Sequence, residues 1–179
     1  MTLADLRARL PDYAKDLKLN LDSVLSEGGA PGLDGKQIRA VALASAIASR
    51  YRPLTRAIEA FAAEQLSPEE LDGARIAASL MGMTNVYYRF THLVKDPEYK
   101  TLRAGLRMNA MGNPGLDKAA FELASLAASA IKGCEACVDS HERTLRQHGI
   151  DAQGVQSAAR IAAVVHAVAV TLEQLPDAM

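Results

Sequence analysis

Alanine dominates several long stretches of this sequence, and this restricts the folds open to the chain. Alanine has the highest helix propensity, and its small side chain lets helices pack closely. We find no sustained alternation of apolar and polar residues, the pattern typical of strands, and aromatic residues make up only 4% of the chain. We therefore predict an all-α fold, a helical bundle. The densest stretches read VALASAIAS, ARIAAS, FELASLAASA and ARIAAVVHAVAV.

Length and charge set further limits. The 179 residues, 49% of them hydrophobic, suffice for one well-packed domain, which we expect to span residues 1–179. The 20 Lys and Arg residues nearly balance the 21 Asp and Glu residues, which leaves a net charge of -1. Such a surface has no bulk positive field to attract phosphates, so we expect no nucleic-acid partner.

Targeting signals are not evident in the sequence. The most apolar segment, residues 161–172, is shorter than the roughly 18 residues of a membrane helix and contains His166. The N-terminal sequence MTLADLRARLPDY has no apolar block ahead of a cleavage site. We therefore expect no membrane association and a cytoplasmic location. In that reducing compartment, two cysteines three positions apart are typical of a redox or metal-binding pair.

Helix start and stop signals divide the chain. The glycine-rich cluster at 28–32 is the clearest linker, Ser67 and Pro68 are typical of a helix start, and Gly133 is placed to end a long helix. Between residues 97 and 115 we find no clear pattern. We expect helices from residue 2 to Pro11, around 17–25, over 36–49, after Pro53, after Ser67, and over 84–94, 116–132, 134–148 and 152–173.

Two short motifs recur in the same order in both halves. Ala-Leu-Ala-Ser at 42–45 returns as Glu-Leu-Ala-Ser at 122–125, and Ala-Arg-Ile-Ala-Ala at 74–78 returns at 159–163. Chance matching in alanine-rich helices is one explanation, and a duplicated helical unit is the other. We predict duplication, with an N-terminal repeat at about 36–94 and a catalytic C-terminal repeat at about 116–175.

Only the second repeat carries polar chemistry. The first pair of motifs is offset by 80 positions. This offset places the apolar residues Leu54, Ala57 and Phe61 opposite Cys134, Cys137 and His141.

One constellation in the second repeat holds both cysteines of the chain. Glu122 is followed after eleven residues by Cys134, after two more by Cys137, and after three more by His141. On a helix, Cys134 and Cys137 share one face, and His141 lies one turn beyond Cys137. Helical side chains lean toward the N-terminus, so the imidazole leans over the Cys137 sulfur. A nucleophile and a base are therefore expected within reach of each other.

The start of this helix favours a thiolate. A helix that restarts after Gly133 places the cysteines in its first turn, where free N–H groups and the helix dipole lower the pKa of a thiol. This end effect alone favours Cys134 as the nucleophile. Because His141 lies one turn from Cys137, we assign Cys137 as the attacking thiolate and Cys134 as the resolving thiol. If the chain folds back at Gly133, Glu122 can orient or deprotonate His141 or Cys137.

Other interpretations of these residues remain open. Two cysteines in an alanine-rich core can be inert apolar residues, and Glu122 can be an ordinary exposed glutamate. The four side chains are also of types that bind zinc, although the usual second ligand pair is lacking. A c-type haem is excluded because Val138 follows Cys137, and no strand-helix-strand pattern points to a thioredoxin-like fold.

The segment FELASLAASAIKGCEACVDSHERTLRQHGI resembles the core motif of the alkyl hydroperoxidase D family, within the carboxymuconolactone decarboxylase-like superfamily. Peroxidase members share the spacing found here at Glu122, Cys134, Cys137 and His141, and the resemblance extends to TNVYYRFTHLV at 84–94. It implies an all-helical fold, usually a homotrimer, that reduces organic hydroperoxides. It further implies electrons from dihydrolipoamide on a lipoylated acyltransferase, no bound cofactor or metal, and a partner peroxiredoxin, the peroxiredoxin component of alkyl hydroperoxide reductase.

The resemblance also implies a role for each residue. Cys137 takes the peroxide oxygen as a sulfenic acid, Cys134 donates a proton and resolves, and the two form a redox disulfide. Glu122 and His141 form the proton relay. The chain departs from the pattern at Ala136, where some members carry a second histidine. This departure bears on the rate and the proton route rather than on dithiol exchange.

Three alternative functions remain. The chain can be a protein disulfide reductase without peroxidase activity, or a zinc-stabilised helical interaction module. A lyase acting on a lactone, as in the decarboxylase branch, has no need of the cysteine pair. We assign the remaining candidates to packing, to the surface or to a subunit contact: His92, His148, His166, Tyr87, Tyr88, Met81 and Met83.

Overall fold

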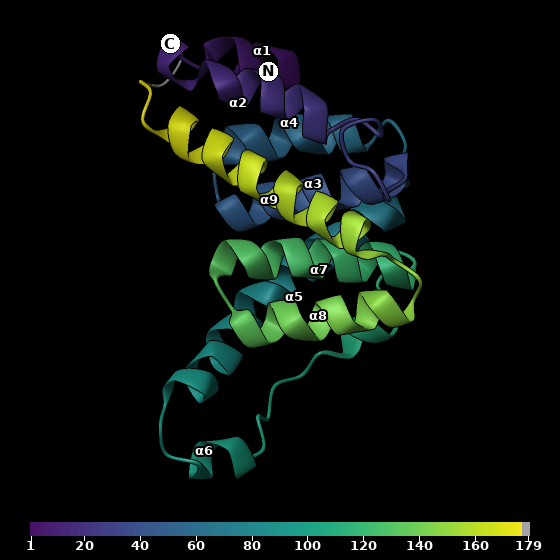
Figure 1. The fold of residues 1–179 in the computed structure, drawn as a ribbon, viewed down its shortest axis with the longest axis vertical. Coiled ribbons are helices and arrows are strands. Elements are labelled where there is room, and N and C mark those ends of the chain that lie inside the picture. The colour runs from purple at the N-terminus through teal and green to yellow at the C-terminus, as the bar shows by residue number, and fades with distance from the viewer. Residues whose placement is uncertain (177–179) are drawn as a thin grey trace.

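The computed structural model describes residues 1–176, and every regular element in that range is a helix (Figure 1). The predicted all-α fold is therefore confirmed. Two elements are short 3₁₀ turns, η1 (Asp12–Ala14) and η2 (Asn109–Gly112). The α-helices are α1 (Leu3–Arg9), α2 (Lys15–Val24), α3 (Gly35–Ser49), α4 (Arg52–Ala62), α5 (Pro68–Leu93), α6 (Glu98–Thr101), α7 (Lys118–Lys132), α8 (Glu135–Gln147) and α9 (Ala152–Glu173).

Side-chain caps fix where the long helices begin. The side-chain oxygen at each start accepts a hydrogen bond from the backbone N–H three residues later, which satisfies a donor that the helix leaves unpaired. Ser67 forms a capping box with Glu70. The other capping side chains are Asp34 of α3, Asp117 of α7 and Asp151 of α9.

The segments expected after Ser67 and over 84–94 are one continuous helix, α5. The residue between them with low helix propensity is Gly82, and a single interior glycine costs only about 1 kcal/mol. The stretch 97–115, which shows no clear pattern in the sequence, holds the short helix α6 and the turn η2.

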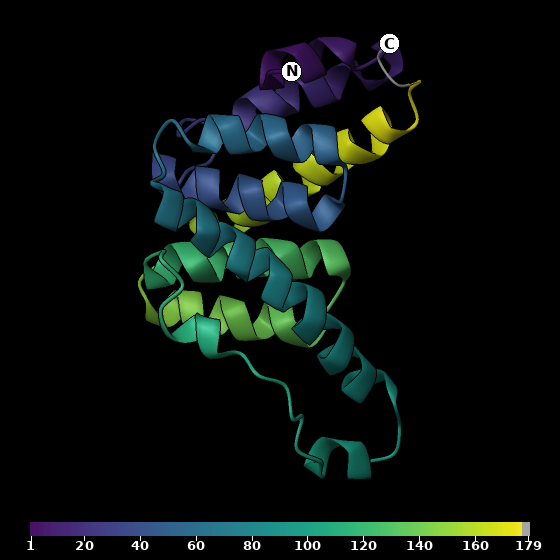
Figure 2. The same cartoon turned by 180° about the vertical axis from the view of Figure 1, so that it is seen from behind.

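Two alanine-rich helices, α3 and α7, lie side by side at the centre of the molecule. Of the fifteen residues in each, ten are buried. Helices α4, α5 and α9 pack on α3, and α5, α8 and α9 pack on α7. In Figure 2, α5 crosses obliquely over both central helices and continues beyond them. The small side chains on α3 and α7 are therefore enclosed on nearly every side.

Helix α9 corrects one expectation from the sequence. Its 22 residues are long and apolar enough to cross a membrane by length and composition, although residues 161–172 alone are too short. Half of its most apolar window is buried inside the protein. Because α9 packs on α2, α3 and α7, its apolar side chains serve the core.

Helix starts in the two halves recur at a constant spacing. The N-cap residues of α3 and α7, Asp34 and Asp117, are 83 positions apart, as are those of α4 and α8, Tyr51 and Cys134. The N-caps of α5 and α9 are 84 apart. This register differs from the offset of 80 and places Tyr51, Leu54 and Ile58 opposite the cysteines and His141. In either register the first half has no thiol, and the duplication stays a prediction.

The end of α5 and the segment after it form an arm that projects from the helical stack, with α6 at its tip (Figures 1 and 2). Phe90 and Tyr99 meet edge to face with ring centroids 5.4 Å apart, which ties α6 back to α5. Exposed apolar side chains gather on this arm: Val86, Phe90, Leu93, Tyr99 and Leu102.

The packing predicts that an enlarged side chain at the centre of α3 is poorly tolerated. Ala44 is fully buried, and Ala44→Leu should lower the free energy of unfolding by about 1–3 kcal/mol through overpacking. Ala60→Leu, on the exposed face of α4, is the matched control and should change it by less than about 0.5 kcal/mol. Urea denaturation of both variants measures the difference, and equal stabilities would contradict the close packing.

Candidate active site

A sharp turn between α7 and α8 brings the site together. Gly133 ends α7 in the left-handed conformation, at φ 67°, which favours glycine. The next N–H, of Cys134, donates to the Ser129 carbonyl at 3.2 Å. The turn lays α8 back along α7, so that Glu122 and His141 meet. The fold-back expected at Gly133 is therefore present.

Cys134 and Cys137 form a disulfide, with Cα atoms 5.3 Å apart. The sequence predicts both cysteines in the first turn of the helix, but Cys134 is the N-cap of α8, one position before that turn. Cys137 does lie in the first turn, where its N–H donates to the Cys134 carbonyl at 3.1 Å. Both are buried, Cys134 completely and Cys137 with 7% exposed. The end of the helix dipole therefore acts on both sulfur positions.

Glu122 connects three side chains. Although only 3% of the residue is exposed, both carboxylate oxygens are paired. Oε1 accepts from Lys118 Nζ at 2.6 Å, and Oε2 lies 2.6 Å from His141 Nδ1. Glu122 is therefore no ordinary surface glutamate.

These contacts decide the protonation of the pair. Burial tends to raise the pKa of Glu122, but the hydrogen bonds from His141 and Lys118 outweigh it and lower that pKa below its usual range. An ionised carboxylate can only accept, so His141 Nδ1 carries a proton and donates it to Glu122. The other ring nitrogen, Nε2, is then the one that can take a proton from a thiol.

Met81 contacts this second nitrogen. Its Sδ lies 3.2 Å from His141 Nε2, and the residue is 3% exposed. Thr84 Oγ1 donates to the Leu80 carbonyl and lies 3.6 Å from the same sulfur. The sequence assigned Met81 to packing, which it does, but it also borders the imidazole.

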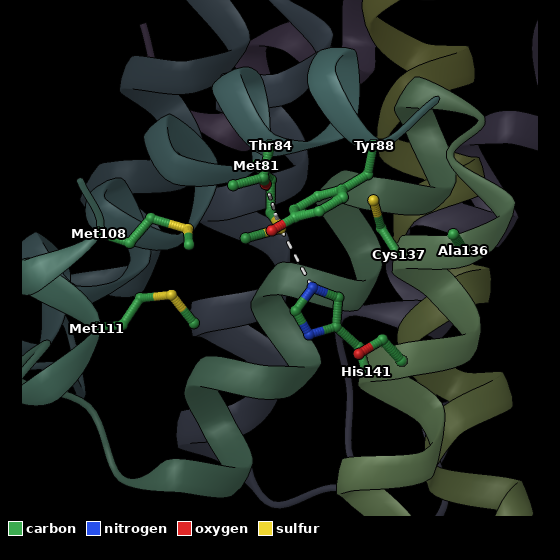
Figure 3. Close-up of a pocket in the computed structure, with 9 residues that line it drawn as sticks. Met81, Thr84, Tyr88, Met108, Met111, Ala136, Cys137 and His141 are labelled. Atoms are coloured by element: carbon green, nitrogen blue, oxygen red, sulfur yellow. Dashed lines mark hydrogen bonds between the residues drawn. The ribbon is translucent and has the colours of Figure 1, made fainter. Parts of the chain in front are cut away.

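An apolar cavity of about 320 Å³ opens beside these residues (Figure 3). Figure 3 shows the Cys137 sulfur and the His141 ring on α8, with methionine side chains reaching in from the opposite side. Met108 and Met111 come from the segment before and within η2. The full lining is Met81, Thr84, Tyr88, Met108, Met111, Ala136, Cys137, Ser140 and His141.

A second, shallower depression lies against Cys134. It borders the three acidic side chains Glu135, Asp139 and Glu142 of α8, together with His92. Cys134 lines this depression but not the methionine cavity, whereas Cys137 lines only the cavity. The two sulfurs therefore face different surroundings.

Several site residues were not identified from the sequence. Lys118 stands four residues before Glu122 on one helix, a spacing that could have indicated the ion pair. Tyr88, Met108 and Met111 carry no comparable local signal. His148 and His166 lie outside the lining of both hollows, as expected.

The buried carboxylate predicts a pH-dependent stability. Because the pKa of Glu122 is lowered on folding, ionised Glu122 stabilises the fold above its usual value of 4.5, and this is lost as the pH falls through the lowered value. Glu122→Gln should cost about 1–3 kcal/mol at pH 7, and the gap to wild type should narrow below pH 4.5. Urea denaturation from pH 3 to 7 measures it. Exposed Glu173→Gln should show no such gap, and a gap for Glu122→Gln that stays constant with pH would contradict the pairing.

Comparison with known proteins gives the same result as the motif. Residues 97–176 match the carboxymuconolactone decarboxylase family. Proteins named alkyl hydroperoxide reductase AhpD are similar over nearly the whole chain. That of Streptomyces coelicolor is 53% identical over 97% of this chain and 96% of its own length. That of Frankia alni is 53% identical over 98% and 93%. The predicted resemblance is confirmed, and the chain belongs to the AhpD family of alkyl hydroperoxide reductases.

Proposed function

We propose that this protein is an antioxidant dithiol peroxidase, an alkyl hydroperoxide reductase that acts through Cys134 and Cys137. The observation that carries the proposal is the cavity in which Cys137 and His141 meet an apolar wall of methionines. A hydroperoxide with an organic group can place that group against the wall and its O–O bond at the sulfur. The name of the relatives supports the same activity.

The first step is oxidation of Cys137. In the reduced protein His141 Nε2 takes the thiol proton, and ionised Glu122 stabilises the imidazolium through Nδ1. The thiolate then attacks the terminal peroxide oxygen. An S–O bond forms, the O–O bond breaks, and the products are the Cys137 sulfenic acid and an alcohol.

Resolution uses the second cysteine. The Cys134 thiolate attacks the sulfenic sulfur, the S–S bond forms, and the hydroxyl leaves as water after it gains a proton. The Cys134–Cys137 disulfide is the product. Its Cα separation of 5.3 Å is within the normal range for a disulfide, so the pair closes without a backbone shift.

An external dithiol then restores the pair. Dihydrolipoamide on a lipoylated acyltransferase attacks one sulfur, forms a mixed disulfide, and is released as its own disulfide. No bound cofactor or metal takes part in this cycle. Reduced protein also reduces the oxidised cysteines of a partner peroxiredoxin, the peroxiredoxin component of alkyl hydroperoxide reductase. This cycle needs a reducing compartment, in keeping with a cytoplasmic location.

The protein is further proposed to act as a homotrimer. The projecting arm supports this, because its exposed apolar side chains leave a face that a second copy can cover. Single exposed apolar residues are normal, but five on one short arm are a contiguous set.

Two other functions are kept as outcomes of the test. A protein disulfide reductase uses the same pair without a peroxide. A zinc-stabilised module needs both thiols as free ligands, whereas here the two sulfurs are bonded to each other.

The peroxidase activity is tested by hydroperoxide consumption in metal-free protein supplied with reduced lipoamide. Wild type should turn over, and Cys137→Ser should fall to the rate without protein, because it lacks the attacking sulfur. Cys134→Ser should accumulate one sulfenic acid per chain at Cys137, measured by dimedone trapping and mass spectrometry. Inactive wild type with two titratable thiols would contradict the proposal, and a zinc assay would then separate the two alternatives.

The oligomeric state is tested on the arm. Leu93 is 75% exposed, and Leu93→Asp should convert a trimer to a monomer in sedimentation velocity because it places a charge in the apolar contact. Leu19 of α2 is 66% exposed and far from the arm in sequence, so Leu19→Asp should stay trimeric. A Leu93→Asp variant with the wild-type sedimentation coefficient would contradict an interface at the arm.

A further inference from the structure

Tyr88 has an unassigned hydroxyl in the cavity. It belongs to the segment 84–94, and it lines the cavity together with Cys137 and His141. In Figure 3 its ring reaches from α5 across the cavity, and the hydroxyl oxygen points inward. Within residues 1–176 the hydrogen bond that involves Tyr88 outside the helix ladder uses its carbonyl, which accepts from Thr91 Oγ1. The phenol is therefore available to a ligand.

The peroxide step needs a proton donor at this place. When the O–O bond breaks, the organic oxygen leaves as an alkoxide, a strong base, unless it is protonated. The other polar groups of the cavity are mostly engaged. Thr84 Oγ1 donates to the Leu80 carbonyl, and His141 Nδ1 donates to Glu122. Cys134 borders the other depression in the disulfide state, not the cavity.

Two hydroxyls in the cavity, those of Tyr88 and Ser140, have no such partner among the described residues. A phenol is a much stronger acid than an aliphatic alcohol, so it is the better donor to a leaving oxygen. We propose that Tyr88 is a further catalytic residue, which binds the organic oxygen of the hydroperoxide and protonates it as it leaves. This inference rests on the proposed peroxidase function.

Atoms and electrons balance in this step. The Cys137 thiolate gives an electron pair to the terminal peroxide oxygen, and the S–O bond forms as the O–O bond breaks. Sulfur is oxidised to the sulfenic acid, which keeps the peroxide proton, and the peroxide is reduced. The alkoxide takes the Tyr88 Oη proton to become the alcohol, and the tyrosinate regains a proton from water.

The test varies the leaving group. Pre-reduced protein is mixed with tert-butyl hydroperoxide or with peracetic acid, and the rate of thiol loss is followed by rapid quench with N-ethylmaleimide and intact mass. Acetate is a weak base and leaves without a proton, whereas tert-butoxide does not. Tyr88→Phe should slow the first reaction by about 10²-fold and the second by less than about threefold.

Matched variants separate this role from packing. Tyr87 is the neighbouring residue, outside the cavity lining, and its ring meets that of Tyr88 edge to face at 5.4 Å. Tyr87→Phe should change neither rate. Reduction of the disulfide by dihydrolipoamide involves no peroxide, so Tyr88→Phe should leave that rate unchanged and thereby show an intact fold.

Three outcomes would overturn the inference. Tyr88→Phe can react like wild type, or slow both peroxides equally, which is a packing effect. The leaving-group selectivity can instead appear in Ser140→Ala, which makes Ser140 the donor. Wild type that reacts with neither peroxide contradicts the proposed function itself and the role of Tyr88 with it.

Discussion

The contact between α3 and α7 is the one on which the rest of the structure depends. Alanines along both helices keep their backbones close, and the other long helices of the core pack against this pair. Glu122 lies within the buried part of α7. A carboxylate there is stable only if its oxygens are paired, and Lys118 and His141 pair both. The packing of the core and the geometry of the site are therefore one problem.

Local signals account for what was predicted well from the sequence. The capping side chain of Ser67, the left-handed turn at Gly133 and the spacing from Cys137 to His141 each act within a few residues. The long-range contacts had no such signal. Met81 is 60 positions from His141, and Met108 and Met111 come from a segment without periodicity. The repeat register differs by three between the motifs and the helix starts because alanine-rich helices match at several offsets.

The disulfide separates two chemical environments. Cys137 faces an apolar cavity with thioethers, whereas Cys134 faces an open depression with acidic side chains on α8. Ala136, between them, borders both. A small residue at this position keeps the partition thin, and a larger side chain would narrow one side or the other. The departure from the family pattern at Ala136 thus concerns the shape of both hollows as well as a missing imidazole.

Helix α5 runs without a break from the core to the arm. Its early residues, among them Ala74 and Ala77, are buried, its middle supplies Met81 and Tyr88 to the cavity wall, and its end carries Leu93 on the arm. At about 1.5 Å per residue these three regions lie on one rigid rod. A displacement of the arm is therefore transmitted as a rotation or a shift of the cavity wall. Whatever holds the arm also sets the width of the substrate cavity, so assembly and catalysis share a single mechanical element.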